Sequence, residues 1–192
     1  MFKKMISLLA VTMFALTAYS QKVLVSDGAH SRIQFTIIHL GISDITGNFD
    51  KAEMTISVDD KNFTDSQIAF NADVNSINTH IEARDTHLKS ADFFDAATYP
   101  KMDFVSTSIE QGKANNYYML NGNLTMHCVT KPVSLTLVYR GSVVDKKSKK
   151  ETFAYQVMGT VKRSDFAIGG KFPEAMLSDM VRIKGDFELK QK

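Results

Sequence analysis

The segment IEARDTHLKSADFFDAATYP, residues 81 to 100, holds several side chains that can do chemistry. Arg84, Asp85 and His87 stand close together in it, and such a group can bind an anionic headgroup or act as an acid and base. The surrounding sequence offers no serine, histidine and aspartate triad and no nucleophile elbow, which disfavours catalysis. The favoured interpretation is structural: Arg84 and Asp85 tie this segment to a neighbouring element by charge-assisted hydrogen bonds. Arg163 and Asp165, in the motif KRSDF, predict a second tie of this kind.

The five histidines form no recognisable metal motif in the sequence. A zinc site needs three or four converging ligands, often including one close pair. His80 and His87 are two helical turns apart, and neither HExxH nor a cysteine pair is present. We therefore predict no metal site. His39 continues the strand face that begins at Ile33, which makes it the best candidate to meet a ligand headgroup or a buried polar partner.

Apolar and polar residues alternate one by one through most of the chain, which is the period of a half-buried β-strand. About eight such runs are separated by turn-forming residues such as those at 59–62, 111–116 and 140–141. Closing eight strands into an antiparallel barrel would remove the two unpaired edges of an open sheet. A two-sheet sandwich has the same periodicity, so the alternation alone leaves both architectures open.

The interior of an eight-stranded barrel is just wide enough for packed side chains or for one small ligand. Alternation does not distinguish a filled interior from a hollow one. The residues expected to face inward carry no charge, and with His39 they are the residues that would bind a ligand in a hollow interior: Ile33, Phe35, Ile37, Met54, Ile56, Ile68, Phe70, Val74, Met102, Phe104, Leu120, Leu124 and Leu135.

Residues 79–91 break the strand period and predict a helix. Thr79 and Glu82 have the spacing of a capping box, in which each side chain satisfies a free backbone amide at the start of a helix. Pro100 ends the segment and begins the next strand. A helix with one apolar face must cover something apolar, so we expect residues 79–100 to form a lid over one end of the barrel.

The first twenty residues have the layout of a cleaved signal peptide. Lys3 and Lys4 precede an apolar run, and small residues come before a cut at Gln21. The protein is therefore expected in the periplasm or outside the cell as a single domain, residues 21–192. The run is too short to anchor the chain in a bilayer, and no stable membrane insertion of the mature chain is expected.

Without its two signal lysines the chain has 21 basic residues against 21 acidic ones, which gives no electrostatic basis for binding nucleic acid. Cys128 is the only cysteine, so no internal disulfide can form, and a buried, inert thiol is the expected state.

Four stretches together resemble the YceI-like family of exported lipid-binding proteins. They are residues 30–50, 77–106, 120–137 and 161–189, and the RDTHLKS, DFFD and YP motifs are the most specific part. The resemblance implies a lipocalin-like eight-stranded antiparallel barrel with a short helical lid. It also implies an apolar tunnel for a polyisoprenoid or similar amphiphile, a frequent homodimer and no established catalytic residues. Bound lipid, rather than a cofactor, is the expected occupant.

Two positions depart from the family pattern. Cys128 and Ala167 stand where the family commonly has glycine, which often serves close backbone approach or a positive φ angle. The local conformation at both positions is therefore open, although the fold is not.

These features predict a carrier that shields the tail of an isoprenoid quinone, a polyprenyl compound or a fatty-acid derivative. Arg84, Asp85 and His87 are candidates for the lid or headgroup contacts, and residues 169–177 are a second candidate rim. Two rivals stay open: an enzyme acting on a lipid, with His39 or the Arg84, Asp85 and His87 group as acid and base, and a stress or interaction protein with a solid core.

Overall fold

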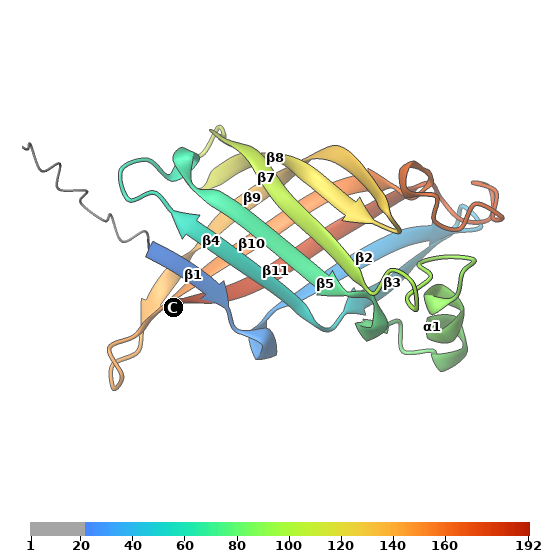
Figure 1. Ribbon diagram of the computed structural model, residues 1–192, viewed down its shortest axis with the longest axis horizontal. Helices are drawn as coiled ribbons and strands as arrows, with labels where there is room; N and C mark the ends of the chain where they lie inside the picture. Colours follow the sequence, from blue (N-terminus) through green and yellow to red (C-terminus); the bar gives the residue numbers. More distant parts are fainter. Residues whose placement is uncertain (1–21) are drawn as a thin grey trace, which may run out of the picture.

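The computed structural model describes residues 22–192, so the predicted signal peptide lies outside the described part of the chain. Eleven strands make one antiparallel sheet (Figure 1). The strands are β1 (Lys22–Ser26), β2 (Arg32–His39), β3 (Ser43–Phe49), β4 (Ala52–Val58), β5 (Gln67–Asp73), β6 (Ile77–Asn78), β7 (Lys101–Gln111), β8 (Tyr117–Met126), β9 (Val129–Val144), β10 (Glu151–Lys162) and β11 (Met180–Gln191). The helices are α1 (Glu82–Lys89) and the short 3-10 turns η1 (Gly28–His30), η2 (Phe63–Asp65), η3 (Val74–Ser76) and η4 (Ser164–Phe166).

The sheet closes into a barrel, as predicted. Going round the ring, each of β1, β4, β5, β7, β8, β9, β10 and β11 is hydrogen-bonded to the next, and β11 pairs with β1 to complete it. These eight strands run antiparallel, so the ring has no free edge. The alternating residues place one face of each strand inside this lipocalin-like barrel.

Three neighbouring strands of the barrel are interrupted at one level. Asp27 and η1 separate β1 from β2, residues 50–51 separate β3 from β4, and η3 separates β5 from β6. The breaks lie side by side, since the Asp50 amide donates to the Ser76 carbonyl at 3.1 Å. The barrel therefore has two parts, a packed end built around β1, β4 and β5, and a hollow end built around β2, β3 and β6.

At the hollow end the wall is completed by chain that is not strand. Strand β3 pairs with β2 along its whole length, but on its other side only Asn48 and Phe49 pair with β6. Residues 79–100 fill this side, with the Phe94 ring against Phe49 at 5.6 Å between centroids. Figure 1 shows α1 beside β3 at this end of the barrel. The lid is thus also part of the side wall.

The start of α1 differs from the predicted capping box. The helix spans Glu82–Lys89, its N-cap is Ile81, and no side chain caps it. Thr79 instead donates its backbone amide to the Asp85 carboxylate at 2.8 Å, and its hydroxyl donates to the same oxygen. In a capping box this hydroxyl oxygen would accept from a backbone amide, but here it accepts from the charged Nε of Arg84 at 2.8 Å, a stronger donor, which explains why the cap did not form.

The turn between β8 and β9 shows the backbone conformation at Cys128. His127 and Cys128 both have left-handed backbone angles, with φ of 49° and 63°, between the paired residues Met126 and Val129. Such a two-residue turn matches the twist of the strands. Cys128 is exposed at its tip, so the prediction of a buried thiol was wrong. Ala167 is also left-handed, with φ of 56°, so both positions keep the conformation that glycine favours.

No helix in residues 22–192 has the length and apolar character needed to cross a membrane.

Candidate functional site

A cavity of about 320 Å³ opens at the hollow end of the barrel. This is roughly twice the ~150 Å³ of an apolar cavity that stays dry and binds benzene. It lies at the lower end of the ~300–1,000 Å³ range of ligand pockets. Its lining is almost wholly apolar: Ile33, Phe35, Ile37, His39, Ile45, Phe49, Phe70, Thr79, Arg84, His87, Leu88, Phe93, Phe94, Met102, Leu124, Met126, Val161, Arg163, Ile168, Phe172, Met176, Leu177, Val181 and Ile183.

Strand alternation positions most of this lining. On β2 every second side chain faces inward, which brings Ile33, Phe35, Ile37 and His39 along one line of the wall. The same rule brings in residues from the neighbouring strands β3, β5, β7, β8, β10 and β11. Nine of the predicted ligand-binding and headgroup residues line the cavity: Ile33, Phe35, Ile37, His39, Phe70, Met102, Leu124, Arg84 and His87.

The remaining predicted ligand-binding residues do not line the cavity. Val74 is buried in η3, outside the barrel strands. The other six are nearly fully buried in the packed part of the barrel: Met54, Ile56, Ile68, Phe104, Leu120 and Leu135. The expected continuous tunnel is therefore corrected to a cavity in one half of the barrel. Alternation tells which face of a strand is inside, but not whether the space in front of it is filled.

Stacked aromatic rings separate the packed end from the cavity. The Phe70 ring borders the cavity and stacks on Phe104 at 4.5 Å between centroids, with an angle of 11° between the ring planes. Phe104 lies flat on the wall because Gly122 has no side chain there, and a Cβ at this glycine would come within 2.3 Å of the ring. The Phe187 ring also packs near Phe70, at 6.2 Å between centroids. These rings form the floor of the cavity.

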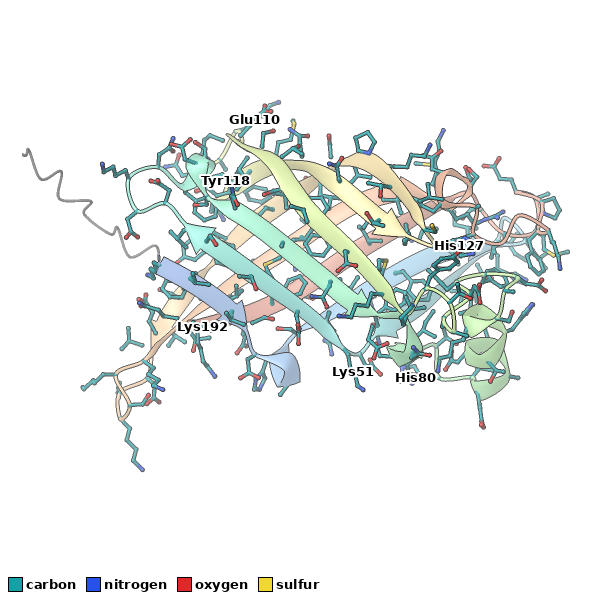
Figure 2. The ribbon with its side chains drawn as sticks, viewed as in Figure 1. Lys51, His80, Glu110, Tyr118, His127 and Lys192 are labelled. Carbon is teal, nitrogen blue, oxygen red and sulfur yellow. The ribbon has the colours of Figure 1, made fainter. Side chains whose placement is uncertain are left out.

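The far end of the barrel is closed by a second aromatic group. Phe63 lies 4.8 Å from Tyr118 and 6.0 Å from Tyr155, and Tyr139 lies 5.2 Å from Tyr155. Burial raises the pKa of Tyr155, with smaller contributions from the neighbouring tyrosines. Figure 2 shows Tyr118 at this end and His127 at the opposite, hollow end. Access to the cavity is therefore from the hollow end.

The lid and the loop between β10 and β11 meet over the cavity. The Phe93 ring of the lid stacks on Phe172 of the loop at 4.9 Å. Beside this stack, Asp92 accepts a hydrogen bond from Lys171 and lies 3.5 Å from the imidazole of His87. The Lys171 ammonium, and to a smaller extent His87, hold the pKa of Asp92 below its usual value. The loop therefore forms a rim, as predicted for residues 169–177, and it is linked to the lid by the Phe93–Phe172 stack, an edge contact of His87 with Phe172 and the Lys171–Asp92 ion pair.

Arg84 and Asp85 both bind Thr79, the first residue of the lid, which directly follows β6. Arg84 donates from Nε to the Thr79 hydroxyl at 2.8 Å and from Nη2 to the Thr79 carbonyl at 2.9 Å, and Asp85 accepts from the Thr79 amide and hydroxyl. Their role is structural, as predicted, but their partner belongs to the lid itself and not to a neighbouring element. Arg84 also borders the cavity, whereas Asp85 does not, and His87 contacts Asp92 instead. The three residues do not form one cluster.

Arg163 is the most strongly held polar group in the cavity wall. Its side chain is 7% exposed, and it fixes the rim loop by donating to five backbone carbonyls, those of Ile168, Gly169, Phe172, Leu177 and Ser178. The tie between lid and strand predicted at KRSDF was wrong, because Arg163 binds carbonyls of the rim loop and none of the lid, and Asp165 is exposed. Every nitrogen of this guanidinium already has an acceptor, so its role in the structure is to hold the loop.

Several cavity residues were not identified from the sequence as ligand-binding residues. Val161, Val181 and Ile183 alternate within strands and were detectable by the same pattern. Phe49, Phe93 and Phe94 come from strand ends and the lid, where no periodicity marks a side chain as inward. Within residues 22–192, no three histidine, cysteine, aspartate or glutamate side chains lie together as a metal site would require.

Comparison with known proteins agrees with this geometry. The model of the YceI-like domain matches residues 24–189. A UPF0312 protein of Pectobacterium atrosepticum is 34% identical over 169 residues, which is 86% of each chain. The crystal structure of the Campylobacter jejuni YCEI protein is 31% identical, with a TM-score of 0.71 over 81% of this chain and 90% of that one.

A polyisoprenoid binding domain from Saccharophagus degradans has the same fold at lower similarity. It is 16% identical, with a TM-score of 0.66 over 88% of this chain and 98% of that one. The match of the family model and of these relatives extends over nearly all of the described barrel. The chain therefore belongs to the YceI-like family.

Proposed function

We propose that this protein is an exported carrier that holds the tail of a long-chain amphiphilic lipid in the cavity at the hollow end. The observation that carries the proposal is the cavity itself, a space of about 320 Å³ with an almost wholly apolar lining. Polar groups of this wall gather near the lid and the mouth, where a headgroup would lie. The polyisoprenoid binding of the Saccharophagus degradans domain, which shares the fold, supports the same ligand class.

The size of the cavity restricts the ligand. A space twice that of a benzene-binding cavity holds on the order of a dozen carbon atoms. Each buried methylene contributes about 0.8 kcal/mol, so a tail of this length can bind tightly without strong polar contacts. A fatty-acid derivative or the first isoprene units of a longer chain fit this space. A longer polyisoprenoid must extend through the mouth or move the Phe70 ring.

Arg84 is the group best placed to meet the headgroup. Its Nε and Nη2 are used by Thr79, and its Nη1 makes no hydrogen bond that the described residues provide. The guanidinium borders the cavity and no carboxylate lies within salt-bridge distance of it in residues 22–192. A phosphate, carboxylate or carbonyl oxygen would satisfy it. His39 and His87, which also border the cavity, are further candidates for headgroup contacts.

The geometry favours carriage over catalysis. The acid and base group considered from the sequence is divided, because Asp85 binds Thr79 while His87 binds Asp92.

The proposal includes a location in the periplasm or outside the cell, in line with the predicted signal peptide. The homodimer implied by the family resemblance stays a prediction, and sedimentation velocity tests it.

Organic extraction followed by mass spectrometry tests the proposal. The purified protein is expected to release one long-chain lipid per chain, unchanged in structure. A chemically altered lipid would favour the enzyme, and an empty extract from protein exposed to membranes would contradict the proposal.

Two adjacent substitutions provide a matched pair. Phe35→Glu places a charge in the cavity wall and is expected to abolish lipid retention, because an unpaired charge is costly in apolar surroundings. Gln34→Glu adds the same charge on the other face of β2 and is expected to retain lipid. Circular dichroism of both variants confirms that they fold.

A further inference from the structure

The turn between β2 and β3 exposes apolar side chains beside the mouth of the cavity. Leu40 is 52% exposed and Ile42 is 85% exposed at the tip of this turn. Ile38, Met176 and Met180 continue the exposed surface on β2, the rim loop and β11. We call these five residues the mouth patch. Exposed apolar patches of this kind mark sites of interaction with proteins or membranes.

The mouth patch is held in place by backbone hydrogen bonds. The Leu40 amide donates to the Met176 carbonyl at 2.9 Å, and the Ser178 amide donates to the Ile38 carbonyl at 2.9 Å. The turn and the rim loop are thus joined into one surface. Its apolar side chains are therefore presented to solvent in a fixed arrangement.

The backbone preferences of amino acids do not favour the residues found at the tip of the β2–β3 turn. Turns usually carry glycine, asparagine or aspartate, because these tolerate left-handed backbone angles. Leu40 nevertheless has a φ of 51°, in a region disfavoured for residues with a large side chain. A residue with an unfavourable backbone conformation that gains no burial from it indicates a function other than stabilising the fold.

The mouth patch is continuous with the cavity. Along β2, Ile37 and His39 face into the cavity, whereas Ile38, between them, faces out. Met176 belongs to both surfaces, since it borders the cavity and is 43% exposed. An apolar surface therefore runs without a break from the outside of the barrel to its interior.

The five residues of the mouth patch carry no charge. Of the charged residues beside it, Arg182 on β11 and Asp44 on β3 form an ion pair, and Glu174 of the rim loop is exposed. The patch itself therefore suits an apolar partner. Five side chains are too few for a stable dimer, because a standard interface uses roughly 20–30 residues on each side.

We propose that the mouth patch docks on a lipid bilayer, with Leu40 and Ile42 inserted among the headgroups and upper acyl chains. Apolar side chains on an interfacial element bind membranes in this way. Docking would place the cavity mouth against the bilayer, so that a lipid tail passes between them without crossing water. The purpose of docking rests on the proposed carrier function, whereas docking itself is measured independently of it.

The opposite end of the barrel provides the control. The β9–β10 hairpin exposes Val143, at 67%, and carries the basic run of residues 146–150. Val143 is thus also an exposed apolar side chain on a hairpin, but this hairpin lies at the end of the barrel opposite α1 (Figure 1). If basic charge rather than the mouth patch attracted the protein to membranes, binding would depend on this hairpin.

Flotation with neutral phosphatidylcholine vesicles tests the proposal in the chain that begins at Gln21, which keeps the apolar signal segment out of the assay. The wild type is expected to float. Ile42→Ser is expected to lower the partition coefficient about tenfold or more, because a large aliphatic side chain is lost from the bilayer. Val143→Ser is expected to leave it within about twofold. Both sites are exposed, so thermal unfolding should confirm that both variants keep the wild-type fold.

The absence of tryptophan from the chain allows a second readout. Ile42→Trp and Val143→Trp each introduce a single fluorophore, and brominated lipids are expected to quench only the first. The proposal is overturned if the wild type does not float, if Val143→Ser loses as much binding as Ile42→Ser, or if the two tryptophans are quenched equally. It is also overturned if Ile42→Ser only converts a dimer to a monomer.

Lipid extraction separates this proposal from the carrier function. Ile42 does not border the cavity, so Ile42→Ser is expected to retain as much lipid as the wild type. A wild type that holds lipid but does not float refutes docking alone. A wild type that floats but yields an empty extract refutes the carrier function alone.

Discussion

Removing the Phe70 ring should lengthen the tail that the protein accepts. The ring borders the cavity and stacks on Phe104, so Phe70→Ala joins a space about the size of benzene, up to ~150 Å³, to the existing cavity. Substitutions of this type cost about 3–5 kcal/mol in the free energy of unfolding. We expect the lower end of this range, because one face of the ring already borders empty space.

The gain in binding follows from the carbons that replace the ring. About six further methylenes can be buried, each contributing about 0.8 kcal/mol, or roughly a fourfold change in Kd. Calorimetry with saturated fatty acids of increasing length measures this directly. In the wild type, the gain per methylene should end near a dozen carbons. In Phe70→Ala it should continue for about six more.

Phe63→Ala is the matched control. It removes an aromatic ring that packs on Tyr118 at the far end of the barrel, away from the cavity. It should lower stability without changing the dependence of affinity on chain length. If Phe70→Ala stays folded and shows the same length dependence as the wild type, the Phe70 ring is not the floor that limits the tail.

Three other predictions concern stability. Cys128→Gly should raise the free energy of unfolding by about 1 kcal/mol in urea denaturation, because glycine relieves the left-handed backbone at φ 63°; no gain relative to Cys128→Ala would contradict this. Arg163→Lys should lower it by about 3 kcal/mol, because one ammonium cannot reach five carbonyls, whereas the exposed Arg182→Lys should change it by less than about 0.5 kcal/mol. Hydrogen bonds, first from Lys190, lower the pKa of Asp27 to about 2. In the unfolded chain the pKa of an aspartate is ~3.9. The stability that the ionised Asp27 contributes to the folded state is therefore fully present above about pH 4 and is lost as pH falls through 2. The stability difference between the wild type and Asp27→Asn should shrink over that window, and a constant difference would contradict this.

The barrel could be predicted from the sequence because its strands obey one simple period. The alternation of Ile33, Phe35 and Ile37 on β2 is the same as that of Met54 and Ile56 on β4, and all five face inward. Their surroundings nevertheless differ, since the first three border the cavity and the last two are packed. The difference depends on distant rings that fill one half of the interior, and no local pattern encodes it.

The interruption that divides the two halves did leave a local signal. Asp27 accepts a hydrogen bond from the Ala29 amide, and Asp73 accepts one from the Asn75 amide. These aspartate turns break two strands at one level of the barrel. An aspartate at the end of an alternating run is typical of such turns, so the breaks were detectable. Their alignment was not, because it depends on the register between strands.

The hydrogen bonds of Thr79 show a second limit of prediction from sequence. The spacing of Thr79 to Glu82 satisfies the capping-box pattern, but the Thr79 hydroxyl accepts from Arg84 Nε and donates to Asp85 instead. Pattern matching at fixed spacing does not compare the strengths of rival hydrogen-bond partners. The same limit applies to Cys128, where a two-residue turn overrides the usual burial of a free thiol.

The division of the barrel separates the requirements for folding from those for ligand choice. The eight-strand ring closes through β1, β4 and β5, whose inward side chains belong to the packed core, whereas most of the cavity wall comes from β2, β3, the lid and the rim loop. Substitutions in the second set can change which molecule is held while the first set continues to specify the architecture. This division makes the barrel a suitable starting scaffold for designed binders of small apolar compounds.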